Sequence, residues 1–218
     1  MHVVSVNVGK PRPVPWRGRT TLSAIFKEPV TGRVAVRRLN LDGDTQADLS
    51  VHGGPDKAVY AYPSEHYPWW HEQLPGAELP WAAFGENLTT AGLVETEVRI
   101  GDEYRVGTAR LVATQPRLPC FKLGIRFGDQ RMVKRFRLSG RPGIYFAVAG
   151  EGDLAAGDAI ELVRTDEAAP TVTDVFRLIV DDRENVDELR RALRAPALAA
   201  VWRTEFAEWL ANLGADLG

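Results

Sequence analysis

The sequence predicts a mainly β domain followed by a small helical extension. Over the first three quarters of the 218-residue chain, short segments rich in β-branched and aromatic residues recur between Gly, Pro and Asp. Regular helical patterns rarely separate them, which favours a barrel or a sandwich. After Pro170 the apolar spacing becomes that of amphipathic helices. A chain of this length accommodates one large domain, or a medium domain with an appendage.

The predicted strands are short and bounded by turn residues. Two Gly-Asp pairs, at 101–102 and 157–158, supply turn chemistry between neighbouring strands. The predicted strands are Val3–Val8, Arg33–Leu41, Ala47–Val51, Lys57–Tyr62, Val94–Ile100, Glu103–Val106, Arg110–Thr114, Gly143–Val148 and Ala159–Val163.

Two helical patterns interrupt the strands. The first covers Ser64–Leu74, with Ser64 as its N-cap, and Pro68 must then lie in its first turns or break it. The second covers Pro119–Leu138, and Gly128 breaks it into two parts.

Three amphipathic helices are predicted at the C-terminal end. They cover Thr173–Ile179, with Thr173 as N-cap, then Val186–Leu193 and Leu198–Leu213, each with apolar residues on one face. Helices this short bury too little surface to fold alone. We expect them to pack on one another and on the β domain.

Charge and cysteine content narrow the classes of function. The formal net charge is −2, so the chain has no electrostatic bias toward nucleic acid or an anionic membrane. A single cysteine excludes an intrachain disulfide and a multi-cysteine zinc or iron–sulfur site. The N-terminus lacks the pattern of a signal peptide, and no apolar run reaches the length of a membrane span. The expected location is the cytoplasm.

The only cysteine, Cys120, lies in the stretch "TQPRLPCFKLGIRF". One interpretation is a small buried hydrophobe, the usual state of a cysteine without a partner. The other is a reactive thiolate. Pro119 favours the first position of a helix, which would put Cys120 in the first turn, where the N–H groups and the helix dipole favour an anion. The cations Arg117, Lys122 and Arg126 would act in the same direction.

A thiolate in this position is compatible with several chemistries. Acyl transfer needs a histidine base, but nothing in the sequence links any of the four histidines to Cys120. A peroxidase-type thiol also fits. A metal bound through a single protein sulfur would need its other ligands from a cofactor.

Three further segments hold polar residues at turns. His52-Gly53-Gly54-Pro55 and the following Lys57 are either an ordinary loop or a glycine nest for an anion. In "FGENLTT", Glu86 and Asn87 would need partners if they are buried. In "SGRPGIY", Arg141 is either an anion-binding arginine or an ordinary loop residue.

Taken together, five motifs resemble the MOSC family, the C-terminal domain of molybdenum-cofactor sulfurases. Within it, the chain resembles the stand-alone bacterial YiiM-like type associated with resistance to hydroxylaminopurine. The resemblance divides the chain into a β domain over residues 1–164 and a three-helix extension over residues 171–218. The motifs are "GDTQADLSVHGGPDKAVYAYP", "FGENLTT", "IGDEYRVG", "QPRLPCFKL" and "GRPGIYFAV", in that order.

The resemblance implies a strongly twisted, barrel-like β domain that binds a molybdenum cofactor (molybdopterin). It implies that Cys120 is the sulfur ligand of the metal or carries sulfur destined for it. Lys57, Arg117, Lys122 and Arg141, with Gly53 and Gly54, are the candidates for holding the cofactor. His52, Glu86 and Asn87 are the candidates for hydrogen bonding and proton transfer beside Cys120.

The implied activity is reduction of N-hydroxylated compounds, such as hydroxylaminopurine-type base analogues, in detoxification. An external flavin or iron–sulfur reductase would supply electrons, because the chain has no flavin fingerprint and no cysteine cluster. The other expected partner is the small N-hydroxylated substrate, and neither nucleic acid nor a membrane is expected. A homodimer stays open. Two alternatives remain, namely a sulfur or cofactor carrier with a persulfide on Cys120 and an interaction module whose helical tail docks a partner.

Overall fold

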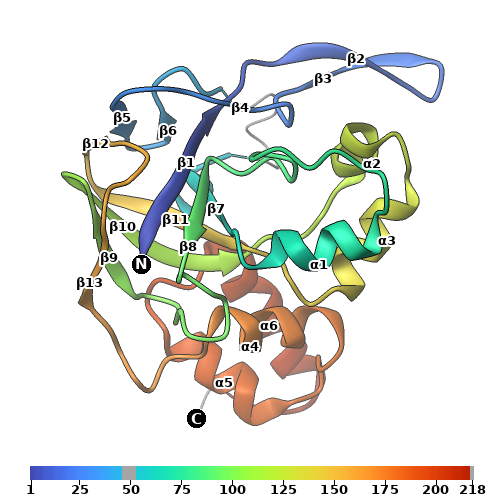
Figure 1. The fold of residues 1–218 in the computed structure, drawn as a ribbon. Coiled ribbons are helices and arrows are strands. Elements are labelled where there is room, and N and C mark those ends of the chain that lie inside the picture. Colours follow the sequence, from blue (N-terminus) through green and yellow to red (C-terminus); the bar gives the residue numbers. More distant parts are fainter. Residues whose placement is uncertain (46–52, 217–218) are drawn as a thin grey trace.

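The structure is a computed structural model that describes residues 1–45 and 53–216. Its centre is an eight-stranded sheet (Figure 1). The strand order is β13-β9-β10-β11-β7-β8-β1-β4, and every pair is antiparallel except β7 with β8. The strands are β1 His2–Val8, β4 Glu28–Pro29, β7 Val59–Pro63, β8 Leu88–Ala91, β9 Glu103–Val106, β10 Ala109–Pro116, β11 Ile144–Gly150 and β13 Ile160–Arg164.

The expected mainly β, barrel-like class was wrong in two respects. Strands make up 31% of the chain and helices 27%, so the fold is mixed α/β. The sheet does not close into a barrel. The start of β1 approaches the residues ahead of β13 through one bridge, between His2 and Ala159, while its far end pairs with the two-residue strand β4. Three backbone hydrogen bonds also join these segments, from Val3 N to Asp158 O, from Gly157 N to Val3 O and from Ile160 N to Met1 O. With a single bridged pair they form no continuous ladder, so the sheet stays open.

Two small sheets flank the main one. β5 Val34–Arg37 pairs with β6 Asn40–Leu41 and β12 Gly152–Leu154, and β2 Arg12–Trp16 forms a hairpin with β3 Arg19–Ser23. The prediction of one strand over 33–41 was therefore wrong, because the chain turns back on itself after Arg37.

Three further strand predictions, for residues 94–100, 57–62 and 47–51, had different outcomes. The segment 94–100 is not a strand. Its alternation arises because Val98 and Ile100 point into the core from a series of turns. Residues 55–57 form a 3-10 turn, η1 Pro55–Lys57, so the predicted strand from Lys57 begins at Val59 instead. The predicted strand Ala47–Val51 lies outside the described residues.

Three short helices lie beside the main sheet. α1 is His66–Gln73, α2 is Phe121–Phe127 and α3 is Arg131–Leu138. Pro68 occupies the first turn of α1 as predicted, but Glu65 rather than Ser64 is the N-cap, and no side chain caps that end. Gly128 ends α2 in the left-handed conformation, with φ of 64°, which explains the break between α2 and α3.

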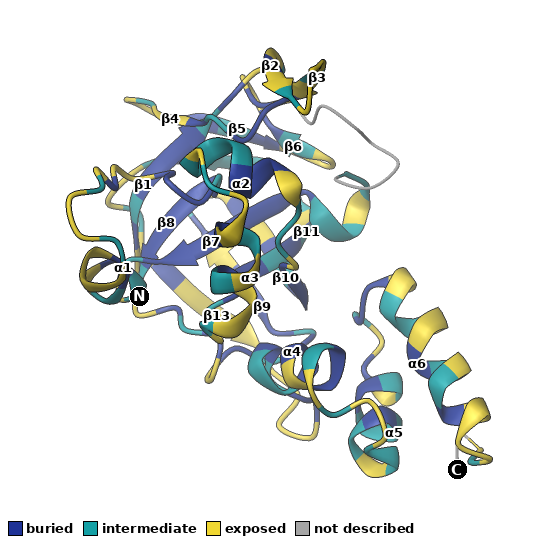
Figure 2. Cartoon of the chain, turned by 90° about the vertical axis from the view of Figure 1, so that its right-hand side faces the viewer, coloured by how far each residue is buried: buried dark blue, intermediate teal, exposed yellow. Residues whose placement is uncertain are grey.

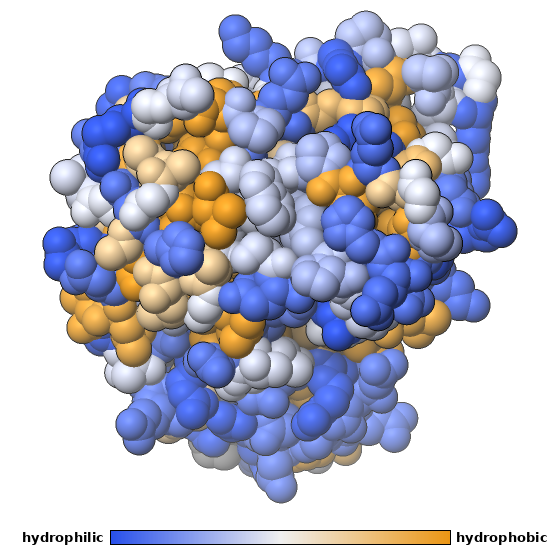
Figure 3. Space-filling model, in the orientation of Figure 1, coloured by the Kyte–Doolittle hydropathy of each residue, from blue (hydrophilic) through white to orange (hydrophobic). Residues whose placement is uncertain are grey.

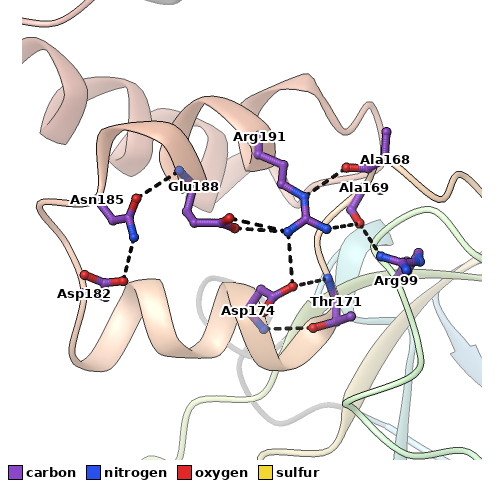
Figure 4. A network of polar contacts seen from close by, with 9 residues as sticks. All are labelled: Arg99, Ala168, Ala169, Thr171, Asp174, Asp182, Asn185, Glu188 and Arg191. Carbon is purple, nitrogen blue, oxygen red and sulfur yellow. Dashed lines mark hydrogen bonds and ion pairs between the residues drawn. The ribbon is translucent and has the colours of Figure 1, made fainter.

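The C-terminal helices lie together below the sheet in the view of Figure 1. They are α4 Val172–Val180, α5 Val186–Arg194 and α6 Ala200–Asn212. Thr171, not Thr173, is the N-cap of α4, and it forms a reciprocal capping box with Asp174. Arg191 of α5 joins this end to Asp174 and to the carbonyl groups of residues 168 and 169 (Figure 4).

The apolar residues form two clusters. The larger runs from the main sheet into the helices, since Leu111, Val175 and Phe206 belong to one cluster. This confirms that the C-terminal helices pack on one another and on the sheet. Buried residues line their inner faces (Figure 2), and the lower face in Figure 3 is largely hydrophilic. The smaller cluster is aromatic and includes Trp70 and Phe84. No helix in residues 1–45 and 53–216 is both long and apolar enough to cross a bilayer.

Candidate functional site

A cavity of about 310 Å³ opens where the end of β10, the loop before α2 and the start of α6 meet. Residues ahead of β4 and β8 complete its wall. The side chains in the wall that carry charge or a nucleophile are Lys27, Asp44, Lys57, Arg117, Cys120 and Lys122. Residues up to 178 positions apart in the sequence, from Ala24 in the loop after β3 to Trp202 of the C-terminal helix, therefore contribute to one site.

Cys120 lies at the end of the loop that follows β10. It is the N-cap of α2, with extended backbone angles (φ −119°, ψ 175°), rather than a residue of the first turn as predicted. Pro119 therefore precedes the cap. The side chain is half-buried and lies in the cavity wall. The N-cap position still puts the thiol beside the unpaired N–H groups that begin a helix.

Arg117 is the most rigidly held cation of the site. It is buried, donates hydrogen bonds to the Phe84 carbonyl oxygen and to the Tyr60 hydroxyl, and stacks over the Tyr60 ring at 4.8 Å. It also interacts electrostatically with Cys120. Its guanidinium stays charged under all ordinary conditions. Arg117 therefore places a fixed positive charge close to the thiol, as the sequence predicted.

A buried ion pair forms a second part of the wall. Lys27 and Asp44, 9% and 4% exposed, form a salt bridge. Asp44 also accepts hydrogen bonds from the Gly9 amide at 2.8 Å and from Asn87 Nδ2 at 2.9 Å. Burial lowers the pKa of Lys27, and the interaction with Asp44 partly offsets this.

Neither Lys27 nor Asp44 was singled out from the sequence. Asp44 opens the first of the five quoted motifs, so its position there was a signal. Nothing in the local sequence distinguishes Lys27, which joins the site only through tertiary contact.

Two more lysines line the cavity. Lys122, in the first turn of α2, is 6% exposed and forms no hydrogen bond or ion pair with any described residue. Lys57 is half-buried, and burial lowers its pKa while Asp56 partly offsets the effect. The described wall thus holds four cationic side chains and one carboxylate.

Asn87 is present in the wall, but its side chain is fully engaged. Its Oδ1 accepts from the Tyr60 amide at 3.1 Å, and its Nδ2 donates to Asp44 and to the Asn7 carbonyl oxygen. Asn87 therefore orients the Asp44 carboxylate through this hydrogen bond.

Glu86 is fully buried behind the wall and does not line the cavity. Its carboxylate accepts hydrogen bonds from Tyr67, Thr89 and the amides of Ala82 and Phe84. Burial raises the pKa of this carboxyl, and the hydrogen bonds oppose the shift. The partners that the sequence required for a buried Glu86 are present.

Three of the remaining predicted site residues, Arg141, Gly53 and Gly54, do not line the cavity. Arg141 donates to the Ser139 carbonyl oxygen, stacks over Trp69 at 4.2 Å and is not among the lining residues. Gly53 and Gly54 precede η1 and do not line the cavity, although Gly54 has the positive φ of 95° that the turn required. His52 lies outside the described residues.

The helical extension supplies one side of the cavity, which the sequence did not indicate. Val201 and Trp202 of α6 belong to the lining. Trp202 Nε1 donates to Gln115 Oε1 at 2.9 Å. Two backbone amides at the start of α6 are also held, Ala199 by the Thr114 carbonyl oxygen at 3.2 Å and Ala200 by Asp56 Oδ2 at 3.0 Å.

Comparison with known proteins places this site in a family. The family model described as "MOSC domain" matches residues 48–161, and the family model described as "YiiM-like, 3-alpha helix domain" matches residues 170–213. The chain belongs to the MOSC family. The MOSC match includes Cys120, Arg117, Lys122 and Lys57, while Val201 and Trp202 fall in the helical match.

The similarity of this MOSC protein to others extends over nearly its whole length. It is 43% identical over 204 residues to the Bacillus subtilis (strain 168) protein described as "Uncharacterized protein YflK", covering 94% of this chain and 92% of that one. The crystal structure of YiiM from Geobacillus stearothermophilus has a TM-score of 0.81 at 35% identity, covering 96% and 98%. A protein of Gibberella moniliformis (strain M3125 / FGSC 7600) named "Reductase" is 38% identical over 165 residues, 74% of this chain but 29% of that longer protein.

Proposed function

We propose that this protein is a molybdenum-cofactor-dependent reductase of N-hydroxylated compounds, with Cys120 as the protein ligand of the metal. The observation that carries the proposal is the position of the only cysteine in a cavity with four cationic side chains. Membership of the MOSC family and the relative named "Reductase" support the same conclusion.

The donor set fits such a cofactor. A molybdenum cofactor carries a phosphate, a planar pterin and a metal with affinity for sulfur. Within residues 1–45 and 53–216, no three His, Cys, Asp or Glu side chains converge on one point, so a soft metal here would have Cys120 as a single protein ligand. Lys122 is buried with no counter-ion among the described residues, and an anion in the cavity would compensate its charge. Arg117 and Lys57 would add to this attraction.

The overall reaction consumes two electrons and two protons, R–NHOH + 2 e⁻ + 2 H⁺ → R–NH₂ + H₂O. When bound, the cofactor would supply a two-electron centre that accepts the oxygen of the N–OH group. The chain would hold that centre through Cys120 Sγ and restrict its movement through Arg117, whose guanidinium is fixed by the Phe84 carbonyl oxygen. An external flavin or iron–sulfur protein would deliver the electrons.

Lys57 Nζ is the proton donor that we assign to the N–O cleavage. Burial lowers the pKa of this ammonium group, which brings it closer to the range where a general acid is effective. Tyr145, also in the wall, has a pKa raised by burial, so its hydroxyl stays protonated and can donate a hydrogen bond to the leaving oxygen.

The test is the molybdenum content of protein made in a host that synthesises the cofactor. We expect nearly one metal per wild-type chain, loss of metal in Cys120→Ser, and reduced content in Lys122→Gln. Lys134→Gln, an exposed lysine of α3, is the matched control and should retain the metal. Equal metal in wild type and Cys120→Ser would remove Cys120 from the ligand role. Functional protein without metal but with a persulfide on Cys120 would favour a sulfur carrier instead.

A further inference from the structure

The cavity has an apolar side that the proposed chemistry does not use. We propose that Trp202 of α6 is the surface on which the planar ring of the substrate, a flat nitrogen heterocycle, stacks. The C-terminal extension would then select which N-hydroxylated molecules reach Cys120. This inference rests on the proposed function, because it names the substrate class of the same site.

The indole of Trp202 is held in one orientation. Its Nε1–H donates to Gln115 Oε1 at 2.9 Å, and Gln115, only 2% exposed, donates in turn to the Asp56 carbonyl oxygen at 3.3 Å. Phe206, one turn further along α6, lies with its ring centroid 5.8 Å from that of Trp202. The half-buried indole is therefore fixed at its polar edge and supported from within its own helix.

The residues beside Trp202 extend the apolar side. Val201 is 48% exposed and Leu118 is 36% exposed, and both line the cavity with Tyr145. Exposed aliphatic groups beside an oriented aromatic ring are typical of pockets that bind flat, partly apolar ligands. An aromatic side chain accepts any base by its π face, so this surface selects for planarity.

The wall that carries Trp202 is attached to the sheet around the cavity. The first amides of α6 bond to the Thr114 carbonyl oxygen and to Asp56 Oδ2. The Thr114 hydroxyl donates to the Asp56 carbonyl oxygen at 2.7 Å, which ties these two anchors to each other. The stacking surface is thus a permanent part of the site and needs no closure of the extension to form.

The substrate, rather than the cofactor, is the occupant that this arrangement favours. All four cationic side chains of the cavity lie outside the helical extension, at positions 27, 57, 117 and 122. A phosphate-bearing cofactor would be drawn to those groups. Trp202 and Val201 contribute no charge, and they lie in the region that matches the YiiM-like helical domain instead of the MOSC domain.

The experiment compares Trp202→Ala and Trp202→Phe with wild type in cofactor-loaded protein. The probes are 6-hydroxylaminopurine, which is planar, and N-methylhydroxylamine, which has no ring. In Trp202→Ala we expect the KM for the purine to rise about 5- to 150-fold, the range that loss of one base–aromatic stack gives. The KM for N-methylhydroxylamine and the molybdenum content should stay unchanged, and Trp202→Phe should retain most of the purine affinity.

Binding of 6-hydroxylaminopurine to the oxidised protein, measured by equilibrium dialysis, gives a readout that does not depend on turnover. It should weaken by a similar factor in Trp202→Ala and not in Trp209→Phe, a control on the same helix that does not line the cavity. Equal loss for both probes, loss of molybdenum in Trp202→Ala, or unchanged purine binding would each overturn the inference. Loaded wild-type protein that binds the purine but reduces neither probe would instead refute the proposed function.

Discussion

The two sides of the cavity differ in how they are built. The side built from residues 24–145 is charged, and two of its buried cations are held by long-range contacts, Lys27 with Asp44 and Arg117 with Phe84. The helical side is apolar, and next to the cavity it is attached through two backbone amides at the start of α6 and the indole of Trp202. Charge that is buried must be compensated, so the first side tolerates little change. The second side carries no such constraint.

The largest expected effect comes from breaking the buried ion pair on the charged side. In Lys27→Met, Asp44 stays buried without its counter-ion, and we expect the free energy of unfolding to fall by about 3–5 kcal/mol. Denaturant unfolding of the protein without cofactor measures this change. The double variant Lys27→Met with Asp44→Asn removes both charges and should recover much of the loss. A single variant as stable as wild type would show that the pair is not desolvated in solution.

A smaller effect than the loss of the ion pair is expected in the pH dependence of anion binding on the charged side. Burial lowers the pKa values of Lys57 and Lys27 below the ordinary 10.5, so both lose their charge at lower pH than an exposed lysine. Pyrophosphate binding to the cofactor-free protein should therefore weaken as pH rises toward 10.5. The same shifts mean that the folded state holds fewer protons than the unfolded state in that window, so stability should rise with pH there.

Lys57→Gln provides the check by isothermal titration calorimetry. It should bind pyrophosphate less tightly and show a shallower pH dependence, while the exposed Lys134→Gln behaves as wild type. A pH profile that is the same in Lys57→Gln and wild type would assign the titration to another group.

The smallest effect is expected at the attachment of the helical side. Asp56→Ala removes the carboxylate that accepts from the Ala200 amide, and loss of a helix cap typically costs about 1 kcal/mol. Hydrogen exchange of the amides in the first turn of α6 should quicken, while molybdenum content is retained. Loss of metal in this variant would mean that the two sides are not independent. Asp56→Asn keeps an acceptor oxygen and is the matched control.

The sequence predicted most elements of the fold where local patterns decide them. The break at Gly128 and the three C-terminal helices follow from turn chemistry and helical spacing. The predicted strand over 94–100 is a series of turns, and the prediction failed because buried turns can alternate as strands do. The predicted barrel is absent from the part of the chain that the structure describes. Closure of a sheet depends on whether its distant edges pair along their length, and here those edges share a single bridge. The sequence did not predict the hairpin of β2 and β3, because two of the five residues of β2 are prolines, and proline is unusual in strands.

The site was only partly predictable for the same reason. Arg117, Cys120 and Lys122 are neighbours in sequence, so their convergence was visible in one motif. Lys27 and Trp202 reach the cavity from opposite ends of the chain, and no local pattern marks them. The helical spacing predicts Trp202 only as part of the apolar face of its helix, because a residue that both packs on a helix neighbour and lines a cavity has the spacing of any core residue.

The way in which α6 is attached has a consequence for how related proteins can diverge. Its first two contacts, with β10 and with η1, use the backbone amides of Ala199 and Ala200, which are present whatever side chains follow. Substitutions at positions 201 and 202 would alter the side of the cavity that they line without disturbing these contacts. If Cys120 holds the cofactor and Trp202 selects the substrate, as proposed above, the two properties could be inherited independently, and a MOSC site could acquire new substrates through its appended helices alone.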